Sequence, residues 1–208
     1  MRIELLKTSP DRAGRYWVSF DNGEKLGLYR QTVEDFGLYT GREICEEEYA
    51  SLQEAAGAMS AKMRAVRIVA ASSVTKKDLQ QRLVQKGEDP AKAAEAVAWM
   101  EEMHLVDDAE TARQIVSRCA SRGYGLARAK QALYEKKVPR RYWEEALVDY
   151  PDQTDRIVSF LRGRLTDSED PKQIKRAVDA LLRRGHSYGQ IRSALDRLSL
   201  DAEDFPEE

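Results

Sequence analysis

The chain has 208 residues, of which 42% are hydrophobic and 34% charged, and its net charge is −2. These values are typical of a soluble, largely helical protein, built either as one large domain or as a small domain joined to a repeat array. Only two cysteines occur, Cys45 and Cys119, without a CxxC motif, which excludes a disulfide framework and a cysteine-based zinc site.

The first forty residues have strand character. Residues 15–20 and 24–29 flank Asn22-Gly23, and an Asn-Gly pair between two such segments predicts a β-hairpin because both residues tolerate a positive φ. Residues 3–6 are a candidate third strand. Residues 32–37 predict a short helix that ends at Gly37.

The period changes to that of a helix after the hairpin. Apolar residues recur at alternating spacings of four and three from Cys45 to Val66, interrupted only by Gly57. This pattern predicts either one long helix or two collinear helices. Cys45 and Cys119 both fall on apolar positions of helical patterns, so we expect both to be small buried side chains.

The remaining chain repeats one pattern three times. Segments around Leu79, Ala129 and Ala177 each have apolar residues at i, i+4 and i+5 and end in a basic residue, usually followed by glycine. Similar helices precede and follow each segment. We therefore expect a mainly α-helical protein, a tandem array of three three-helix repeats preceded by a small extension that contains the β-hairpin. The expected boundaries are 1–57 for the extension, 58–106, 107–151 and 152–200 for helical repeats 1, 2 and 3, and 201–208 for an acidic tail.

The net charge conceals an uneven distribution. Residues 1–60 carry 7 basic and 11 acidic side chains, residues 61–200 carry 27 and 20, and the last eight residues carry five carboxylates and no base. Within residues 111–145 nine side chains are basic and three are acidic. A basic middle of this kind indicates an acidic partner, such as nucleic acid or a carboxylate-rich protein.

Two clusters of basic residues stand at corners between predicted helices. One surrounds Gly123-Tyr124-Gly125, and the other is followed by Tyr188. Guanidinium groups beside an exposed tyrosine suit phosphate contacts, base stacking or a carboxylate-rich surface, whereas the alternative is a solvated helix face with an ordinary glycine turn. The candidate partner-binding or DNA-binding residues are Arg118, Arg122, Tyr124, Arg128, Lys130, Lys136, Lys137, Arg140, Arg141, Arg183 and Arg184.

Catalysis finds little support in the sequence. The two histidines, His104 and His186, have no serine, cysteine or carboxylate at a recognisable spacing, and no nucleotide-binding GxxxxGK[ST] or GxGxxG motif occurs. Asp107-Asp108 is interpreted as a helix start, since adjacent side chains on a helix point in different directions. We expect a binding protein that is not an enzyme and has no catalytic residue, metal site or cofactor. No apolar run reaches the roughly 18 residues of a membrane span, and the N-terminus resembles no signal or transit peptide, so we expect a cytoplasmic protein.

Each repeat carries short motifs at matching places: Ser72-Ser73 and Lys77-Asp78-Leu79 in repeat 1, Leu105-Val106-Asp107-Asp108 and Lys136-Lys137-Val138 in repeat 2, and Leu181-Leu182-Arg183-Arg184-Gly185 in repeat 3. In their order, these motifs resemble those of the RecX family of bacterial recombination regulators, over nearly the whole chain. The extension and its turn at residues 37–41 resemble the longer Gram-positive members. Two positions depart from the family pattern: Thr111 replaces a usual aromatic residue, and Lys137 replaces a usual glycine.

The resemblance implies a function that spacing alone does not. Members of this family bind the RecA–DNA filament, in its helical groove, and modulate, usually by inhibition, strand exchange and co-protease activity in DNA repair, recombination and the SOS response. Some also contact DNA directly, which makes single-stranded DNA a second expected partner. We expect a monomer without membrane contact.

Two other classes remain open. Three-helix units also describe helix-turn-helix domains, so a DNA-binding transcriptional regulator is the alternative. That class concentrates its basic residues on one recognition helix and binds as a two-fold dimer. An adaptor repeat that binds only protein is the third class.

Overall fold

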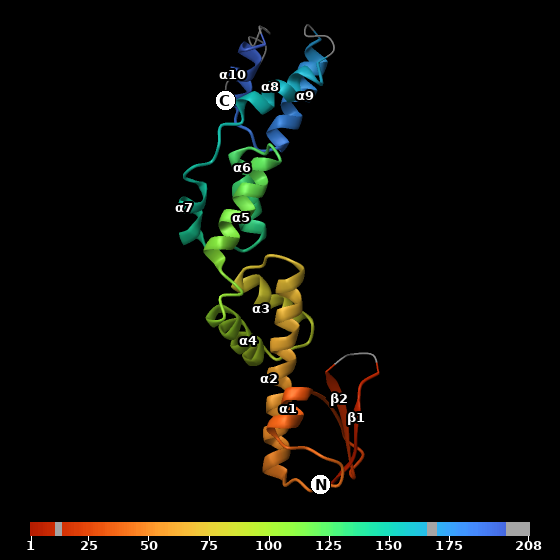
Figure 1. Ribbon diagram of the computed structural model, residues 1–208. Coiled ribbons are helices and arrows are strands. Elements are labelled where there is room, and N and C mark those ends of the chain that lie inside the picture. The colour runs from red at the N-terminus through yellow and green to blue at the C-terminus, as the bar shows by residue number, and fades with distance from the viewer. Residues whose placement is uncertain (11–13, 166–169, 199–208) are drawn as a thin grey trace. The chain divides into compact units, whose positions relative to one another are not determined.

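The computed structural model describes residues 1–10, 14–165 and 170–198 (Figure 1). It divides the chain into two compact units, one of Met1–Val106 and one that begins at Asp107. The end of the predicted third repeat, 199–200, and the predicted acidic tail, 201–208, lie outside the described residues.

The first unit starts with a three-stranded antiparallel sheet. Its strands, β1 (Ile3–Thr8), β2 (Arg15–Phe20) and β3 (Lys25–Tyr29), are hydrogen-bonded in the order β1-β2-β3. Gly23 in the β2–β3 turn has a φ of 82°, which glycine adopts without strain. The predicted hairpin and third strand are therefore confirmed. A short helix, α1 (Arg30–Asp35), follows, and Gly37, with a φ of 56°, ends it as predicted.

One long helix, α2 (Glu46–Ala71), serves both the sheet and repeat 1 (Figure 1). Leu52 and Ala56 in its first half are buried with the apolar face of the sheet, whereas Ala61 and Ala65 in its second half are buried in repeat 1. The pattern from residue 45 to 66 thus forms one helix rather than two. Residue 57, the expected end of the extension, lies inside it.

Cys45 stands at the N-cap of α2 and is exposed. Its Sγ accepts a hydrogen bond from the Glu48 backbone N–H at 3.4 Å, and a Glu48 carboxylate oxygen accepts one from the Cys45 N–H. The expectation that both cysteines are buried is wrong for Cys45, because an N-cap side chain folds back onto the first turn at the surface. Cys119 is buried, as expected.

Three-helix units make up the rest of the described chain. Each has its own hydrophobic cluster, and the mainly helical fold with three such units is confirmed. Repeat 1 consists of the second half of α2, α3 (Lys76–Gln85) and α4 (Pro90–Glu102); repeat 2 of α5 (Asp108–Ser121), α6 (Leu126–Glu135) and η1 (Arg140–Tyr142) with α7 (Trp143–Leu147); repeat 3 of α8 (Thr154–Arg162), α9 (Pro171–Arg183) and α10 (Tyr188–Asp196).

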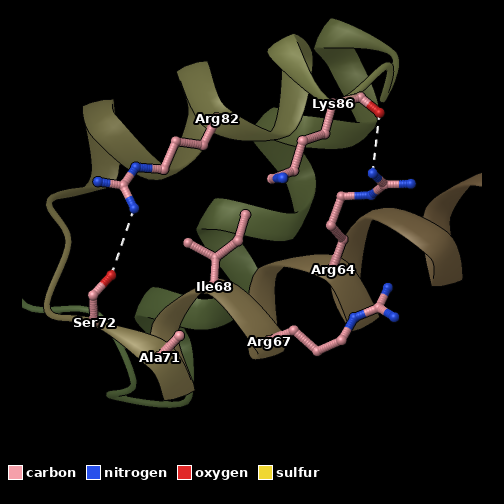
Figure 2. Close-up of a pocket in the computed structure, with 7 residues that line it drawn as sticks. All are labelled: Arg64, Arg67, Ile68, Ala71, Ser72, Arg82 and Lys86. Carbon is pink, nitrogen blue, oxygen red and sulfur yellow. Dashed lines mark hydrogen bonds between the residues drawn. The ribbon is translucent and has the colours of Figure 1, made fainter.

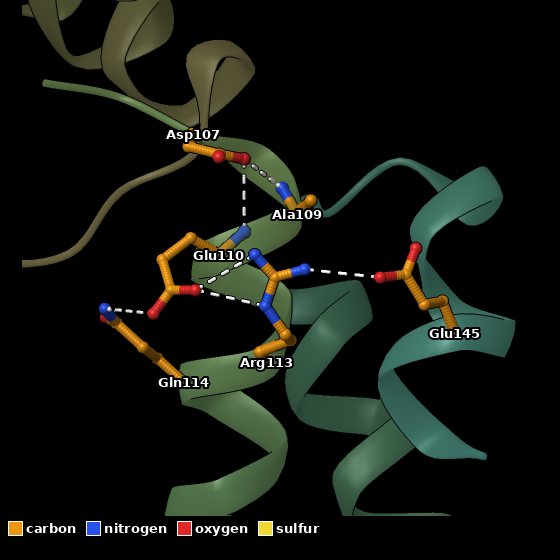
Figure 3. A network of polar contacts seen from close by, with 6 residues as sticks. All are labelled: Asp107, Ala109, Glu110, Arg113, Gln114 and Glu145. Carbon is orange, nitrogen blue, oxygen red and sulfur yellow. Dashed lines mark hydrogen bonds and ion pairs between the residues drawn. The ribbon is translucent and has the colours of Figure 1, made fainter. Parts of the chain in front are cut away.

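Polar contacts fix the start of α5 and join it to α7 (Figure 3). Asp107 is the N-cap, and its Oδ1 accepts hydrogen bonds from the backbone N–H groups of Ala109 and Glu110. Arg113 binds the Glu110 carboxylate at 3.0 Å and reaches Glu145 of α7 at 3.3 Å. The interpretation of Asp107-Asp108 as a helix start is confirmed.

Residues with a left-handed backbone conformation follow the ends of several helices. Gly87 and Gly185, with φ of 87° and 85°, follow α3 and α9, and Lys137 takes the same conformation after α6 with a φ of 58°. Lys137, at which the sequence departs from the family pattern, therefore keeps the backbone geometry that glycine supplies elsewhere.

Candidate partner-binding surface

Repeats 2 and 3 meet through the backbone of two glycines. The Gly125 N–H donates to the Arg184 carbonyl at 2.9 Å, and the Ala127 N–H donates to the Gly185 carbonyl at 3.2 Å. A Cβ placed on Gly125 would lie 2.0 Å from the Gly185 carbonyl oxygen, and one placed on Gly185 would lie 2.3 Å from the Arg128 nitrogen. This contact, which we call the repeat 2–3 junction, leaves no room for a side chain at either position.

Tyr124 and Arg184 belong to this junction. The Arg184 guanidinium lies 5.1 Å from the centroid of the Phe160 ring and 6.0 Å from that of Tyr124, within the range of cation–π attraction. The Tyr124 carbonyl accepts a hydrogen bond of 2.8 Å from the Tyr150 hydroxyl. Both Tyr124 and Arg184 are half-buried. The expectation of an exposed tyrosine is therefore wrong for Tyr124, which packs against the hydrophobic cluster of repeat 2, whereas Tyr188 of the other basic cluster is exposed.

A further arginine joins the repeats without having been predicted. Arg156, in the first turn of α8, donates from one guanidinium nitrogen to the carbonyl oxygens of Ala120 and Ser121, at 3.0 and 2.6 Å. Both carbonyls lie in the last turn of α5, where no further turn of the helix supplies donors; that of Ala120 also accepts from the Gly123 N–H at 3.0 Å. The sequence did carry a signal, since a cation in a first turn opposes its own helix dipole and so indicates a partner elsewhere.

Exposed cations surround the junction. Arg118, Arg122 and Arg128 all lie close enough to Cys119 to favour its thiolate, although burial has the larger effect and raises the pKa of the thiol. Arg183 directly precedes Arg184 at the end of α9. The junction thus brings together the two basic clusters that the sequence places some sixty residues apart. We call Arg118, Arg122, Arg128 and Arg183 the junction cations.

Three junction cations are available to a partner. Arg118, Arg122 and Arg183 are exposed, and their side chains form no ion pair or hydrogen bond within the described part of the chain. Arg128 pairs with Glu135 at 3.3 Å, but this contact is solvent-exposed and therefore weak. The result is a positive surface at the place where the repeats join.

The other predicted residues lie elsewhere in repeat 2. Lys130 is exposed on α6, and Lys136 and Lys137 follow its C-terminal end. Arg140 stacks on the Trp143 ring at 3.9 Å, and Arg141 on the Tyr142 ring at 4.7 Å. Lys130 thus stands two residues after the junction cation Arg128 on the same helix, whereas Arg140 and Arg141 lie at the start of the η1–α7 segment.

Taken together, these observations define a helical-repeat protein with a small N-terminal sheet and a basic surface where two repeats join. No helix among the described residues has both the length and the apolar character to cross a membrane. A family model described as RecX, second three-helix domain, matches residues 107–147, which contain α5, α6 and α7.

Similar proteins span the chain. Regulatory protein RecX of Clostridioides difficile (strain 630) is 25% identical over 203 residues, which are 95% of this chain and 94% of that protein. Regulatory protein RecX of Halorhodospira halophila (strain DSM 244 / SL1) is 30% identical over 157 residues, which are 73% of this chain and 97% of that protein. The chain belongs to the RecX family of regulatory proteins.

Solved structures share the fold. A crystal structure of regulatory protein RecX matches with a TM-score of 0.65 and 18% identity, over 94% of this chain and 98% of that one. RecX from Lactobacillus salivarius matches with a TM-score of 0.62 and 20% identity, over 71% of this chain and 99% of that one. The mainly helical arrangement is thus shared with known members of the family.

Proposed function

We propose that this chain binds the RecA–DNA filament, in its groove, and inhibits recombination and co-protease activity as a cytoplasmic monomer. Membership in a family of regulatory proteins supports the proposal. The observation that carries it is the placement of Arg118, Arg122 and Arg183 around one junction, exposed and without an ion pair in the described chain. A filament made of nucleic acid and protein offers phosphates and carboxylates to such a surface.

The energetics favour an anionic partner. An exposed guanidinium is hydrated and stable in the absence of a partner. It gains charge-assisted, bidentate hydrogen bonds when a phosphate or carboxylate is placed against it. Contacts to phosphates also release counterions, which makes the affinity fall with salt. A sequence-specific transcriptional regulator would instead gather its cations on one recognition helix, whereas the junction cations come from α5 and its C-cap Arg122, from α6 and from α9.

The test uses the double variant Arg118→Ala/Arg122→Ala. The wild-type chain at micromolar concentration is expected to lower the ATPase rate of RecA on single-stranded DNA. The double variant should need a higher concentration for the same effect, and the difference should shrink in high salt because the lost contacts are ionic.

A matched control is Arg176→Ala/Arg192→Ala, which removes two exposed arginines from α9 and α10 of repeat 3. This control should inhibit like the wild type. If the wild-type chain leaves the RecA ATPase unchanged, the proposed function fails. Equal inhibition by both double variants would remove the junction cations from the contact.

A further inference from the structure

Repeat 1 contains a pocket of about 420 Å³ between the second half of α2 and α3 (Figure 2). The residues that α2 contributes stand one turn apart along one helix face, and Arg82 of α3 stands one turn before Lys86, the C-cap of that helix. Four of the seven lining side chains are basic. The lining residues are Arg64, Arg67, Ile68, Ala71, Ser72, Arg82 and Lys86.

Two of the basic side chains are held in place by carboxylates. The Arg64 Nε lies 2.6 Å from the carboxylate of Glu88, whose side chain is only 8% exposed. Arg82 lies 2.8 Å from the carboxylate of Asp78, whose side chain is 10% exposed. Arg64 also donates to the Lys86 carbonyl (Figure 2). These contacts fix two guanidinium groups at the pocket before any ligand arrives, which lowers the entropy cost of binding.

The other two basic side chains have no such restraint. Arg67 and Lys86 are exposed, and neither forms a side-chain ion pair within the portion of the chain that the structure describes. With four cations and two carboxylates, the pocket and its supports carry two positive charges in excess. Like charges that line one pocket repel one another, and an anion bound among them relieves the repulsion.

We propose that this pocket binds a phosphate group of a single-stranded nucleic acid. Its cations come from two helices and reach the pocket from different sides, which suits the tetrahedral oxygens of a phosphate better than the planar pair of a carboxylate. The Ser72 hydroxyl adds a neutral hydrogen-bonding group. Ile68 and Ala71 supply apolar surface for the sugar or base next to the phosphate. The site belongs to the first unit and the junction cations to the second, and the proposed pocket does not depend on the proposed function.

The test measures binding of a fluorescein-labelled oligothymidylate, without RecA, at several salt concentrations. Arg67→Ala/Lys86→Ala should weaken binding by about tenfold and reduce the slope of log K against log salt by about 1, because phosphate contacts are lost. Arg64 and Arg82 are left unchanged, since removing either would leave a buried carboxylate unpaired and destabilise the fold.

Two further variants complete the experiment. Lys7→Ala/Lys77→Ala removes two exposed lysines of the same unit, on β1 and α3, and should keep wild-type affinity and slope. The charge-preserving pair Arg67→Lys/Lys86→Arg should restore most of the binding, whether or not alanine at these positions alters the fold.

Absence of wild-type binding to the oligonucleotide would overturn the proposal. An unchanged affinity and salt slope for Arg67→Ala/Lys86→Ala would also overturn it. The same holds if this variant loses affinity for a polyglutamate peptide but not for the oligonucleotide. These outcomes are separate from the RecA ATPase result, because no RecA is present.

Discussion

His186 of repeat 3 contacts repeat 2, where its Nε2 lies 3.2 Å from the carbonyl oxygen of Gly123. A carbonyl can only accept a hydrogen bond, so Nε2 carries the proton and Nδ1 does not. Nδ1 is buried and has no hydrogen-bond partner among the described residues. Burial, as the larger cause, and the charge of Arg184 lower the pKa of His186, against the opposing effect of the bond to Gly123.

Acid should therefore destabilise the repeat 2–3 junction. With its pKa lowered in the folded chain, His186 takes up a proton more readily when unfolded, so its contribution to stability is complete above the unfolded pKa of about 6.5. That contribution is lost as the pH falls from there through the folded pKa. Urea unfolding from about pH 7.5 to about pH 5 should show a steeper loss for the wild type than for His186→Gln. Identical pH profiles for the wild type and His186→Gln would contradict the prediction.

Gly125→Ala should strongly weaken the same junction. Gly125 has an ordinary backbone conformation, so alanine is excluded only by the 2.0 Å approach of its Cβ to the Gly185 carbonyl oxygen. The backbones must move apart, at a cost of about 2–3 kcal/mol in the free energy of unfolding. Gly189, near the start of α10, has nothing within 4 Å of its Cβ position. Gly189→Ala should therefore stabilise the chain by about 0.5 kcal/mol, and urea unfolding of the two variants should give opposite signs.

His104 offers a site for stabilisation. It follows α4 with a φ of 54° and is exposed. A left-handed conformation destabilises the folded state by roughly 1–2 kcal/mol for a residue other than glycine. Glycine avoids this cost, but its greater conformational entropy in the unfolded chain cancels part of the gain. His104→Gly should raise the free energy of unfolding by about 0.5 kcal/mol, and the β-branched His104→Val should lower it by about 1 kcal/mol. Equal urea midpoints for both variants would show that this backbone carries no strain.

The two cysteines should differ in reactivity. Cys45 is exposed, whereas Cys119 is buried and burial raises the pKa of its thiol. Because the thiolate is the reactive form, Cys119 should react slowly despite its arginine neighbours. A thiol reagent should label Cys45 rapidly in the native wild type and both cysteines in urea. In Cys45→Ser only slow labelling should remain, and rapid labelling of that variant would contradict the burial of Cys119.

Local signals in the sequence were sufficient for most of the fold. Asn22-Gly23 predicted the hairpin because the turn needs residues that accept a positive φ, and the apolar periods predicted the helices. Gly57 left the number of helices over residues 45–66 open. The structure keeps Gly57 inside one continuous helix, where the end of the Lys92 side chain of α4 lies against it. Cys45 shows what the apolar spacing cannot distinguish. A small residue at the first position of the pattern can be either an exposed N-cap or a buried helix residue.

The candidate site depends on contacts between distant residues. The sequence marked Tyr124 and Arg184 as members of separate basic clusters, but nothing local indicates that they pack together. The pocket in repeat 1 was missed because its cations are divided between two helices. Arg64 with Arg67 and Arg82 with Lys86 do have helical spacing, yet only the packing of α2 on α3 makes them one site.

The continuity of α2 has a mechanical consequence. Its 26 residues form a rod of about 39 Å whose two halves are buried in different hydrophobic clusters. A torque applied to the β-sheet is therefore transmitted to α3 and α4 without an intervening hinge.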